Sequence, residues 1–377
     1  MSVSPDSQSQ VADGAAPGAQ ASLTIDLAAL AANWRLLAAR AGEVECGAAV
    51  KADAYGIGLA EAAPALARAG CKTFFVAHLS EAMTVRRLVP RARVFLLNGL
   101  PPHGAESLRP NDVRPVLGDL GQLQRWRDLG AGPCAIQIDT GMNRMGLRWD
   151  AAAPDANDLS TLGVELMLSH FVAAEDAGHP ITRLQIDRFA TWRARYPNIA
   201  ASLANSSAHF LDERPFYALT RPGYALYGGN PTPGRPNPMR DVVRLVATIL
   251  CLRDVPAGEP CGYNAAWTAR RPSRIATIGV GYADGYPRQC GGSDDRPGGY
   301  ALIAGARAPV VGRISMDLTL LDVTDCPDAR LGAPATLIGD GLGVDQIGVW
   351  AGTNGYEILT RLGHRYARSH TGRRAFI

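Results

Sequence analysis

The first two thirds of the chain alternate between short apolar runs and longer segments with apolar residues at helical spacing. Segments such as residues 27–40, 80–89 and 121–130 have the helical pattern, and Asp26 is placed to cap the first of them. Eight apolar runs are predicted as buried strands, within residues 46–51, 72–78, 92–98, 112–117, 133–139, 163–170, 200–205 and 217–223. Buried strands that alternate with helices indicate a parallel sheet covered on both faces.

Polar residues at the strand ends help to choose between two architectures for this sheet. Lys51, Asp139, His170, Asn205 and Arg221 each stand at or just beyond the carboxyl end of a different predicted strand. A barrel gathers those ends into one ring, whereas an open, doubly wound sheet spreads them along a crevice. We therefore predict a (β/α)8 TIM barrel.

The pattern changes after a proline-rich linker at residues 231–240. Apolar and polar residues then alternate between Gly and Pro turns, which is typical of a β-rich domain. The segments with this alternation are residues 241–255, 273–282, 300–323 and 333–341, and one closing helix is predicted at roughly 346–362. The predicted organisation is a disordered tail at 1–21, a barrel at 22–240 and a β-rich C-terminal domain at 241–377.

Composition excludes several classes of function. The net charge is only +3 over 377 residues and no stripe of Lys or Arg occurs, so we expect no nucleic-acid partner. The seven cysteines show no paired or metal-binding spacing, which predicts reduced thiols, a cytoplasmic location and no metal site. No apolar stretch approaches the ~20 residues that span a bilayer, and the N-terminus does not resemble a signal peptide.

Lys51 is the residue with the most unusual position. Five small or apolar residues precede it, so its side chain starts in the core and its amine faces the barrel mouth. Desolvation there favours the neutral, nucleophilic amine that forms imines with aldehydes, although many strand-end lysines are simply solvated. Turns at 205–207 and 221–229 offer backbone N–H groups, and Gly223 permits close approach of a phosphate. A phosphorylated aldehyde such as pyridoxal phosphate fits this combination.

Nine motifs carry a resemblance to the bacterial alanine racemases, and they span residues 22 to 377. In order they are KADAYGIG, DTGMNRMG, SHF, LANSSA, RPGYALYG, GYNAAWTA, IGVGYADGYPR, VGRISMD and GTNGYEILTRL. The resemblance implies an isomerase that uses pyridoxal 5'-phosphate to interconvert L- and D-alanine. Its product would supply D-alanine for peptidoglycan in the cell wall.

The resemblance also implies roles for individual residues around the cofactor. Lys51 would form the imine bond, and Arg221 would face the pyridine nitrogen. Because a guanidinium keeps its proton, Arg221 can donate a hydrogen bond but cannot protonate the ring, which makes the cofactor a weaker electron sink. The implied phosphate site consists of Tyr55, Ser206, the backbone around Gly223 and Tyr224, and Tyr356, with Asn205 beside it.

Racemisation removes a proton from one face of Cα and returns one to the other, so a single fixed base cannot serve both faces. The resemblance implies that Lys51 serves one face and that Tyr263, contributed by a neighbouring subunit, serves the other. His170 would lie between Tyr263 and Arg221 in a hydrogen-bonded row. A homodimer with shared active sites follows from this arrangement.

Arg144 and Met316 are the residues that the resemblance places next to the substrate. The planar fork of Arg144 would meet the substrate carboxylate or the phenolic oxygen of the cofactor, and Met316 would cap the pocket from the partner subunit. An access channel would be lined by Arg313, Asp317, Tyr282 and Arg288.

Two positions depart from the family pattern. The second is Ile57, where a histidine is common between the two glycines, and we expect it to affect packing only; the first concerns Arg144. Many members have a lysine two residues before the aspartate of the DTG motif, modified to a carbamate that orients the arginine, and Gln137 stands here instead. An amide cannot be carbamylated in that way. We therefore expect Arg144 to be held by neutral hydrogen bonds or by a bound anion such as chloride.

Three alternatives to an alanine racemase remain open at this point. A racemase for serine or for a broader set of amino acids would share these motifs. A non-catalytic pyridoxal-phosphate carrier resembles the barrel alone and would not need the second domain. A decarboxylase of the same architecture would bring acidic and cysteine motifs that this sequence lacks near its second-domain sites.

Overall fold

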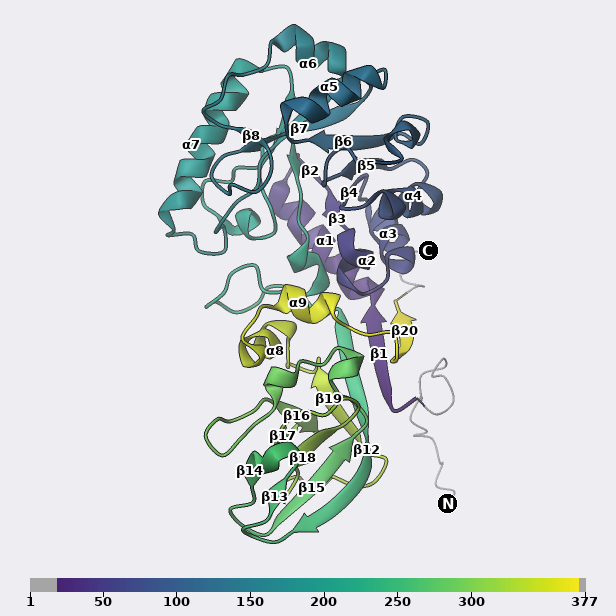
Figure 1. The fold of residues 1–377 in the computed structure, drawn as a ribbon, viewed down its shortest axis with the longest axis vertical. Coiled ribbons are helices and arrows are strands. Elements are labelled where there is room, and N and C mark those ends of the chain that lie inside the picture. The colour runs from purple at the N-terminus through teal and green to yellow at the C-terminus, as the bar shows by residue number, and fades with distance from the viewer. Residues whose placement is uncertain (1–18, 373–377) are drawn as a thin grey trace, which may run out of the picture.

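The computed structural model describes residues 19–372, which form a barrel and a β domain joined through a short helical layer. In Figure 1 the barrel with its helices lies at the top, the β domain lies at the bottom, and α8 and α9 lie between them. One continuous core of buried side chains runs through both parts, and a small second cluster lies around Cys261 in the β domain.

The predicted parallel barrel is confirmed. Its strands are β2 (Glu45–Cys46) with β3 (Ala48–Ala49), β4 (Thr73–Val76), β5 (Arg93–Leu96), β6 (Val113–Leu117), β7 (Cys134–Asp139), β9 (Val164–Leu168), β10 (Ala200–Ser202) and β11 (Leu219–Thr220). Strands β3 to β10 pair in parallel in chain order, and β11 pairs in parallel with β2. The ring closes because the amide of Ala218 donates to the Ala201 carbonyl at 3.0 Å and the amide of Arg221 donates to the Ala204 carbonyl at 2.9 Å.

Helices cover the outside of the barrel, where the sequence pattern places them. They are α1 (Leu27–Ala41), α3 (Leu59–Ala69), α4 (Leu79–Leu88), α5 (Leu120–Asp128), α6 (Ala156–Leu162) and α7 (Pro180–Arg195). The predicted cap at Asp26 is confirmed, because its carboxylate accepts hydrogen bonds from the amides of Ala28 and Ala29 at 2.8 and 3.0 Å. The short strand β8 (Leu147–Arg148) pairs beside β7.

The second domain is built around one long strand, β12. Its strands are β12 (Val243–Val255), β13 (Pro260–Cys261), β14 (Trp267–Thr268), β15 (Ser273–Ile278), β16 (Tyr300–Ile303), β17 (Ala306–Pro309), β18 (Thr319–Asp322) and β19 (Pro334–Ile338). β12 pairs antiparallel with both β15 and β19, and it therefore links the two halves of the domain. The predicted β-rich character of this domain is confirmed.

Two features of the chain ends differ from the sequence prediction. Residues 21–26 form strand β1 (Ala21–Asp26), which pairs with β12 and with β20 (Ala367–Thr371) in the sheet of the second domain. The predicted tail overlaps β1 at its last residue, and residues 1–18 lie outside the described part. The single closing helix is wrong, because α8 (Val344–Ala351) and α9 (Gly355–Thr360) are separate helices. Gly352 ends α8 in the left-handed conformation, with φ of 65°.

Two further observations concern the described residues as a whole. No helix within residues 19–372 is both long and apolar enough to cross a membrane. The same residues contain no group of three or more His, Cys, Asp or Glu side chains that could hold a metal ion.

Candidate active site

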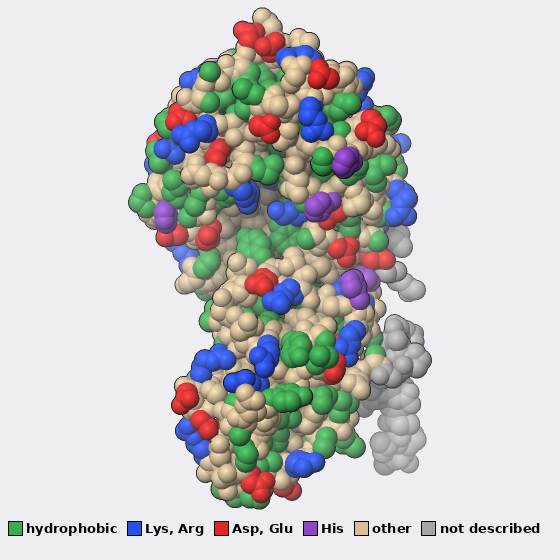
Figure 2. Space-filling model, viewed as in Figure 1, with side chains coloured by type: hydrophobic (Ala, Val, Ile, Leu, Met, Phe, Trp, Pro, Cys, Tyr) green, Lys and Arg blue, Asp and Glu red, His purple; other side chains and the backbone are tan. Residues whose placement is uncertain are grey.

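A cavity of about 650 Å³ opens at the carboxyl ends of the barrel strands and is closed on one side by α9. Figure 2 shows the molecule hollowed where the barrel meets the β domain, with basic side chains beside the hollow. The predicted site residues that line the cavity are Lys51, Tyr55, Gln137, Arg144, His170, Asn205, Ser206, Arg221, Gly223, Tyr224 and Tyr356. Residues far apart in the sequence therefore meet at one end of the barrel, as expected for a barrel enzyme.

Lys51 stands two residues beyond β3 and faces the cavity. Burial lowers the pKa of its ammonium group, the positive charge of Arg144 lowers that pKa further, and the carboxylate of Glu81 opposes both effects. The amine is therefore deprotonated more readily than that of a surface lysine, which is what nucleophilic attack on an aldehyde requires.

The four residues after Lys51 form one turn of left-handed helix. Ala52, Asp53, Ala54 and Tyr55 have φ of 54°, 52°, 53° and 55°. This conformation costs an L-residue roughly 1–2 kcal/mol, and a bulky aromatic residue adopts it rarely. Strained backbone of this kind concentrates at functional sites. Here it brings the Tyr55 ring into a stack with Tyr227, with ring centroids 4.5 Å apart.

The loops after β10 and β11 form a compact cradle of donors at one end of the cavity. The Oγ atom of Ser206 accepts hydrogen bonds from the amides of Gly223 at 3.0 Å and Ala225 at 3.2 Å, so its own hydroxyl hydrogen is free to point elsewhere. A Cβ atom at Gly223 would lie only 2.3 Å from the Tyr55 hydroxyl oxygen. The absent side chain therefore lets the loop and Tyr55 meet. Hydroxyl and amide donors at one point suit an anion such as a phosphate.

The second domain completes this cradle through α9. The rings of Tyr356 and Tyr224 stack with centroids 3.9 Å apart. The Tyr224 hydroxyl donates to the Asp345 carboxylate on α8 at 2.6 Å, and burial raises the pKa of the Tyr356 phenol to about 12. Both phenols thus remain protonated near neutral pH and can act as hydrogen-bond donors.

Arg221 and His170 also line the cavity, and near neutral pH the first is cationic and the second is neutral. Arg221 is buried and donates hydrogen bonds to the Ser202 hydroxyl and to the Ser169 carbonyl. Burial lowers its pKa to about 10, so the guanidinium stays cationic near neutrality. Burial, together with Arg221 and Arg144, lowers the pKa of His170 to about 3, so its imidazole is neutral. No hydrogen bond joins Arg221 to His170 within residues 19–372, and the row that includes Tyr263 stays a prediction.

The loop that carries Arg144 is fixed by its neighbours. One carboxylate oxygen of Asp139 accepts from the amides of residues 141–143 at 2.9 to 3.1 Å. The side-chain amide of Gln137 donates to the Met145 carbonyl at 2.9 Å. Within residues 19–372 no hydrogen bond or ion pair holds the Arg144 guanidinium itself. These bonds fix the loop and not the guanidinium, so the neutral hydrogen bonds expected for Arg144 are not found within the described residues, and the bound anion stays a prediction.

Tyr263 and Met316 do not line this cavity. Both lie on the surface of the β domain, where Tyr263 is 65% exposed and Met316 is 54% exposed. Their exposure leaves both side chains accessible to another chain.

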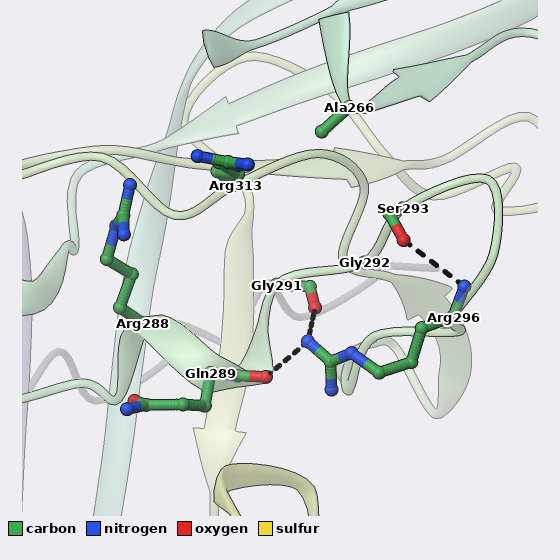
Figure 3. Close-up of a pocket in the computed structure, with 8 residues that line it drawn as sticks. All are labelled: Ala266, Arg288, Gln289, Gly291, Gly292, Ser293, Arg296 and Arg313. Carbon is green, nitrogen blue, oxygen red and sulfur yellow. Dashed lines mark hydrogen bonds between the residues drawn. The ribbon is translucent and has the colours of Figure 1, made fainter. Parts of the chain in front are cut away.

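The arginines predicted to line the access channel lie around a second hollow on the β domain. Arg288 and Arg313 line this hollow, which has a volume of about 310 Å³ (Figure 3). Arg296 lies across from them, and its guanidinium donates to the carbonyls of Gln289 and Gly291. The other two predicted channel residues stand elsewhere on the domain surface: Tyr282 is exposed, and Asp317 pairs with Arg365 at 2.8 Å. None of the four lines the cavity that contains Lys51.

Sequence reasoning missed some residues around the cavity. Asn98 lines it just beyond the end of β5, and the rule about polar strand ends applied to Asn98 as well. Asn354 and Glu357 line it from the start of α9, where an Asn followed three residues later by Glu is a recognised helix-start signal. Two further residues contact the site without lining the cavity. Glu81 binds the backbone amides after Lys51, and Asp345 binds the Tyr224 hydroxyl.

The fold and the cavity together define the class of protein. It is a barrel enzyme in which a strand-end lysine and a cradle of hydroxyl groups line one cavity, as in pyridoxal-phosphate enzymes that carry an additional β domain. Comparison with known families narrows the class. The family model for the alanine racemase N-terminal domain matches residues 25–231, and that for the alanine racemase C-terminal domain matches residues 242–370. The chain belongs to the alanine racemase family.

Individual relatives agree with this assignment. The chain is 54% identical over 359 residues to an alanine racemase of Methylobacterium sp. (strain 4-46), covering 93% of this chain and 97% of the relative. It is 51% identical over 354 residues to an alanine racemase of Acidiphilium cryptum, covering 92% of this chain and 97% of the relative.

The solved structures of the family have the same fold. An alanine racemase from Bartonella henselae with covalently bound pyridoxal phosphate matches with a TM-score of 0.87 and 37% identity, covering 93% of this chain and 99% of that one. The biosynthetic alanine racemase of Pseudomonas aeruginosa matches with a TM-score of 0.85 and 33% identity, covering 94% of this chain and 99% of that one.

Proposed function

We propose that this chain is a pyridoxal-phosphate-dependent racemase that interconverts L-alanine and D-alanine, and that its D-alanine serves peptidoglycan synthesis. The observation that carries the proposal is the cavity in which the Lys51 amine, with its lowered pKa, shares its walls with the hydroxyls of Tyr55 and Ser206 and with Gly223. When bound, the cofactor supplies an electron sink for the negative charge that develops at Cα.

The described residues fit this cofactor. Lys51 would hold its aldehyde carbon, and the phosphate would take hydrogen bonds from the hydroxyls of Tyr55, Ser206 and Tyr356 and from the backbone around Gly223 and Tyr224, beside Asn205. The fit rests on two observations. The Ser206 hydroxyl hydrogen is free, and the missing Cβ of Gly223 leaves room beside Tyr55. The hydroxyls of Ser206 and Tyr55 can therefore donate to a phosphate.

Arg221 would set the electronic character of the cofactor. Its guanidinium is held by two neutral oxygens and stays cationic near neutrality, so it can donate a hydrogen bond to the ring nitrogen without giving up its proton. A cofactor ring whose nitrogen stays unprotonated withdraws less electron density from Cα than a ring with a protonated nitrogen does. Quick return of a proton to Cα is then favoured over transfer to the cofactor, which suits a racemase.

Two groups would move the proton. The Lys51 amine accepts or donates a proton on one face of Cα, and the hydroxyl of the partner subunit's Tyr263 does so on the other face. The exposure of Tyr263 supports this proposal, because its own chain offers no cavity for it. His170 would stand behind Tyr263 as a neutral imidazole that can accept a hydrogen bond. A homodimer with two shared active sites is therefore part of the proposal.

Arg144 and Met316 would select the substrate. The Arg144 guanidinium has no partner among the described residues, so it is available for the carboxylate of an amino acid or for the phenolic oxygen of the cofactor. The partner subunit's Met316 would limit the space for the side chain, and alanine is preferred on this basis. A serine or broad-specificity racemase is the alternative within the family. We also propose a cytoplasmic location, because all seven cysteines are unpaired.

The attachment of the cofactor can be tested simply, because Lys51 and Lys72 are the only lysines of the chain. The protein is saturated with pyridoxal phosphate, reduced with borohydride, digested and mapped by mass spectrometry. We expect the cofactor mass on the peptide that contains Lys51, with Lys72 unmodified, and racemisation of alanine by the unreduced protein. Attachment at Lys72 or at the N-terminus, or no attachment, would contradict the proposal.

A further inference from the structure

Through its side chain, Glu81 binds two loop segments at the carboxyl end of the barrel. It is the third residue of α4, and one of its carboxylate oxygens accepts from the amides of Ala77 at 2.9 Å and His78 at 3.1 Å, which caps that helix. Its other oxygen accepts from the amides of Ala52 at 2.6 Å and Asp53 at 3.4 Å. One carboxylate therefore ties the start of α4 to the turn that follows Lys51.

The two amides that Glu81 binds are those that the left-handed turn cannot satisfy itself. The amide of Ala54 donates to the Val50 carbonyl at 3.0 Å, and that of Gly56 donates to the Ala52 carbonyl at 2.8 Å. The first two N–H groups of the turn have no such partner inside it, as at the start of any helix. Without Glu81 they would need another acceptor in a turn whose backbone is already strained.

The far end of the same turn is also held. The Arg368 guanidinium donates to the Gly56 carbonyl at 2.9 Å. The Asp53 carboxylate accepts from the amide of Leu59 at 2.7 Å. Because residues outside the turn hold both of its ends, the turn cannot relax by unwinding at one end. The direction of the Lys51 side chain, just before the turn, is fixed as a result.

We propose that Glu81 is a positioning residue for Lys51: by holding the first two amides of the left-handed turn, it keeps the Lys51 amine aimed at the reacting carbon. The proposal rests on the function proposed above for Lys51 and deepens it. Glu81 lines no part of the cavity, so it acts only through the backbone after Lys51 and through its charge.

The two effects of Glu81 can be separated by two substitutions. Glu81→Gln removes the charge and replaces one of the two accepting oxygens by an NH2 group, which cannot accept a hydrogen bond from a backbone N–H. Glu81→Asp keeps the charge and can still cap α4, whose amides lie on its own segment, but it is one methylene short of the turn. Asp119→Asn is the matched control. Asp119 accepts from the Gln122 amide at 2.8 Å and caps α5 on the same face of the barrel, without contact to the Lys51 turn.

Three experiments compare the wild type with these variants. The first measures kcat and KM for alanine in the protein saturated with pyridoxal phosphate, and the second measures hydrogen exchange of the peptide containing residues 52 and 53. The third measures acetylation of Lys51 relative to exposed Lys72 in the cofactor-free protein, where the Lys51 amine is unmodified. For Glu81→Asp we expect faster exchange, an unchanged Lys51-to-Lys72 ratio, and a kcat lower by about 10- to 100-fold, as for a catalytic group misplaced by about 1 Å. KM should change little. Glu81→Gln should differ from Glu81→Asp in one respect: the ratio of Lys51 to Lys72 acetylation should rise. The reason is that the charge of Arg144 then lowers the pKa of Lys51 with no opposing charge from residue 81.

The outcomes separate this inference from the proposed function. If the wild type racemises alanine and Glu81→Asp keeps its kcat, or if Asp119→Asn loses as much kcat as Glu81→Asp, the positioning role is refuted. If the wild type does not racemise alanine while Glu81→Asp still speeds exchange at residues 52 and 53, the proposed function fails and the hold on the turn stands. If Glu81→Gln does not fold, Glu81→Asp alone decides.

Discussion

Replacing Gly223 by alanine is the most specific perturbation of the phosphate cradle. The added Cβ would lie 2.3 Å from the Tyr55 hydroxyl oxygen, 3.0 Å from its Cζ and 3.3 Å from the Cβ of Ala49. The φ of Gly223 is −131°, which lies outside the left-handed region that favours glycine. Since ordinary contacts begin near 3.4 Å, the Tyr55 hydroxyl must retreat by about 1 Å.

The size of the effect follows from the hydrogen bond that is lost. A hydrogen bond to a charged group contributes about 1.5–3 kcal/mol, and a retreat of about 1 Å removes most of it. Since each 1.4 kcal/mol is a factor of ten, pyridoxal phosphate should bind about 10- to 150-fold more weakly. The effect should be on cofactor affinity, because the added methyl group meets Tyr55 and Ala49 and not Lys51.

The assay is a titration of cofactor-free protein with pyridoxal phosphate, followed by visible absorption. Gly343→Ala is the control, because its φ is −75° and the nearest atom to its added Cβ is 4.0 Å away. Tyr55→Phe should weaken binding to a similar extent, and the Gly223→Ala, Tyr55→Phe double variant should be no worse than the single variants. Wild-type affinity in Gly223→Ala, or additive losses in the double variant, would refute the reasoning.

Three further predictions concern other parts of the chain. Tyr263→Phe should lower kcat at least 100-fold and leave the cofactor absorption intact, and loss of both together would argue against a purely catalytic role. Asp345→Asn should lower the free energy of unfolding by about 1–2 kcal/mol in urea, because it weakens the bonds from the Tyr224 hydroxyl and the Asn230 amide; an unchanged midpoint would contradict this. Burial lowers the pKa of His209 to about 3, below its ordinary value near 6.5, so the unfolded chain takes up a proton that the folded chain refuses between these values. Stability should fall as pH drops through this window, by up to about 1.4 kcal/mol per pH unit for this group, and His209→Phe should make the decline shallower; an equal slope would count against it.

The barrel could be predicted from the sequence because its signals are local. Each strand is an apolar run of its own, and Asp26 caps α1 through amides only two and three residues away. Strand β1 has no such local signal, because its partners β12 and β20 lie more than 200 residues away in sequence. The break between α8 and α9 depends on Gly352, which a helix can also accommodate internally.

The candidate site divides in the same way. Lys51, His170, Asn205 and Arg221 could be found from the rule that polar residues at strand ends meet in a barrel. Gly223 could be found from its turn, and the roles of the other site residues came from the resemblance. Glu81 could not be found, because its contact with the Lys51 turn depends on a left-handed conformation. In the segment Ala-Asp-Ala-Tyr only the aspartate is a residue type that visits that conformation more often than others do.

The most direct test of the central claim follows alanine itself. The protein, saturated with pyridoxal phosphate, is incubated in D2O with pure L-alanine and separately with pure D-alanine, and the products are separated by chiral chromatography and examined by mass spectrometry. We predict that both reactions reach the same equal mixture of enantiomers, with deuterium at Cα. If both enantiomers remained optically pure while the cofactor was bound at Lys51, the assignment of this site to alanine racemisation would be contradicted.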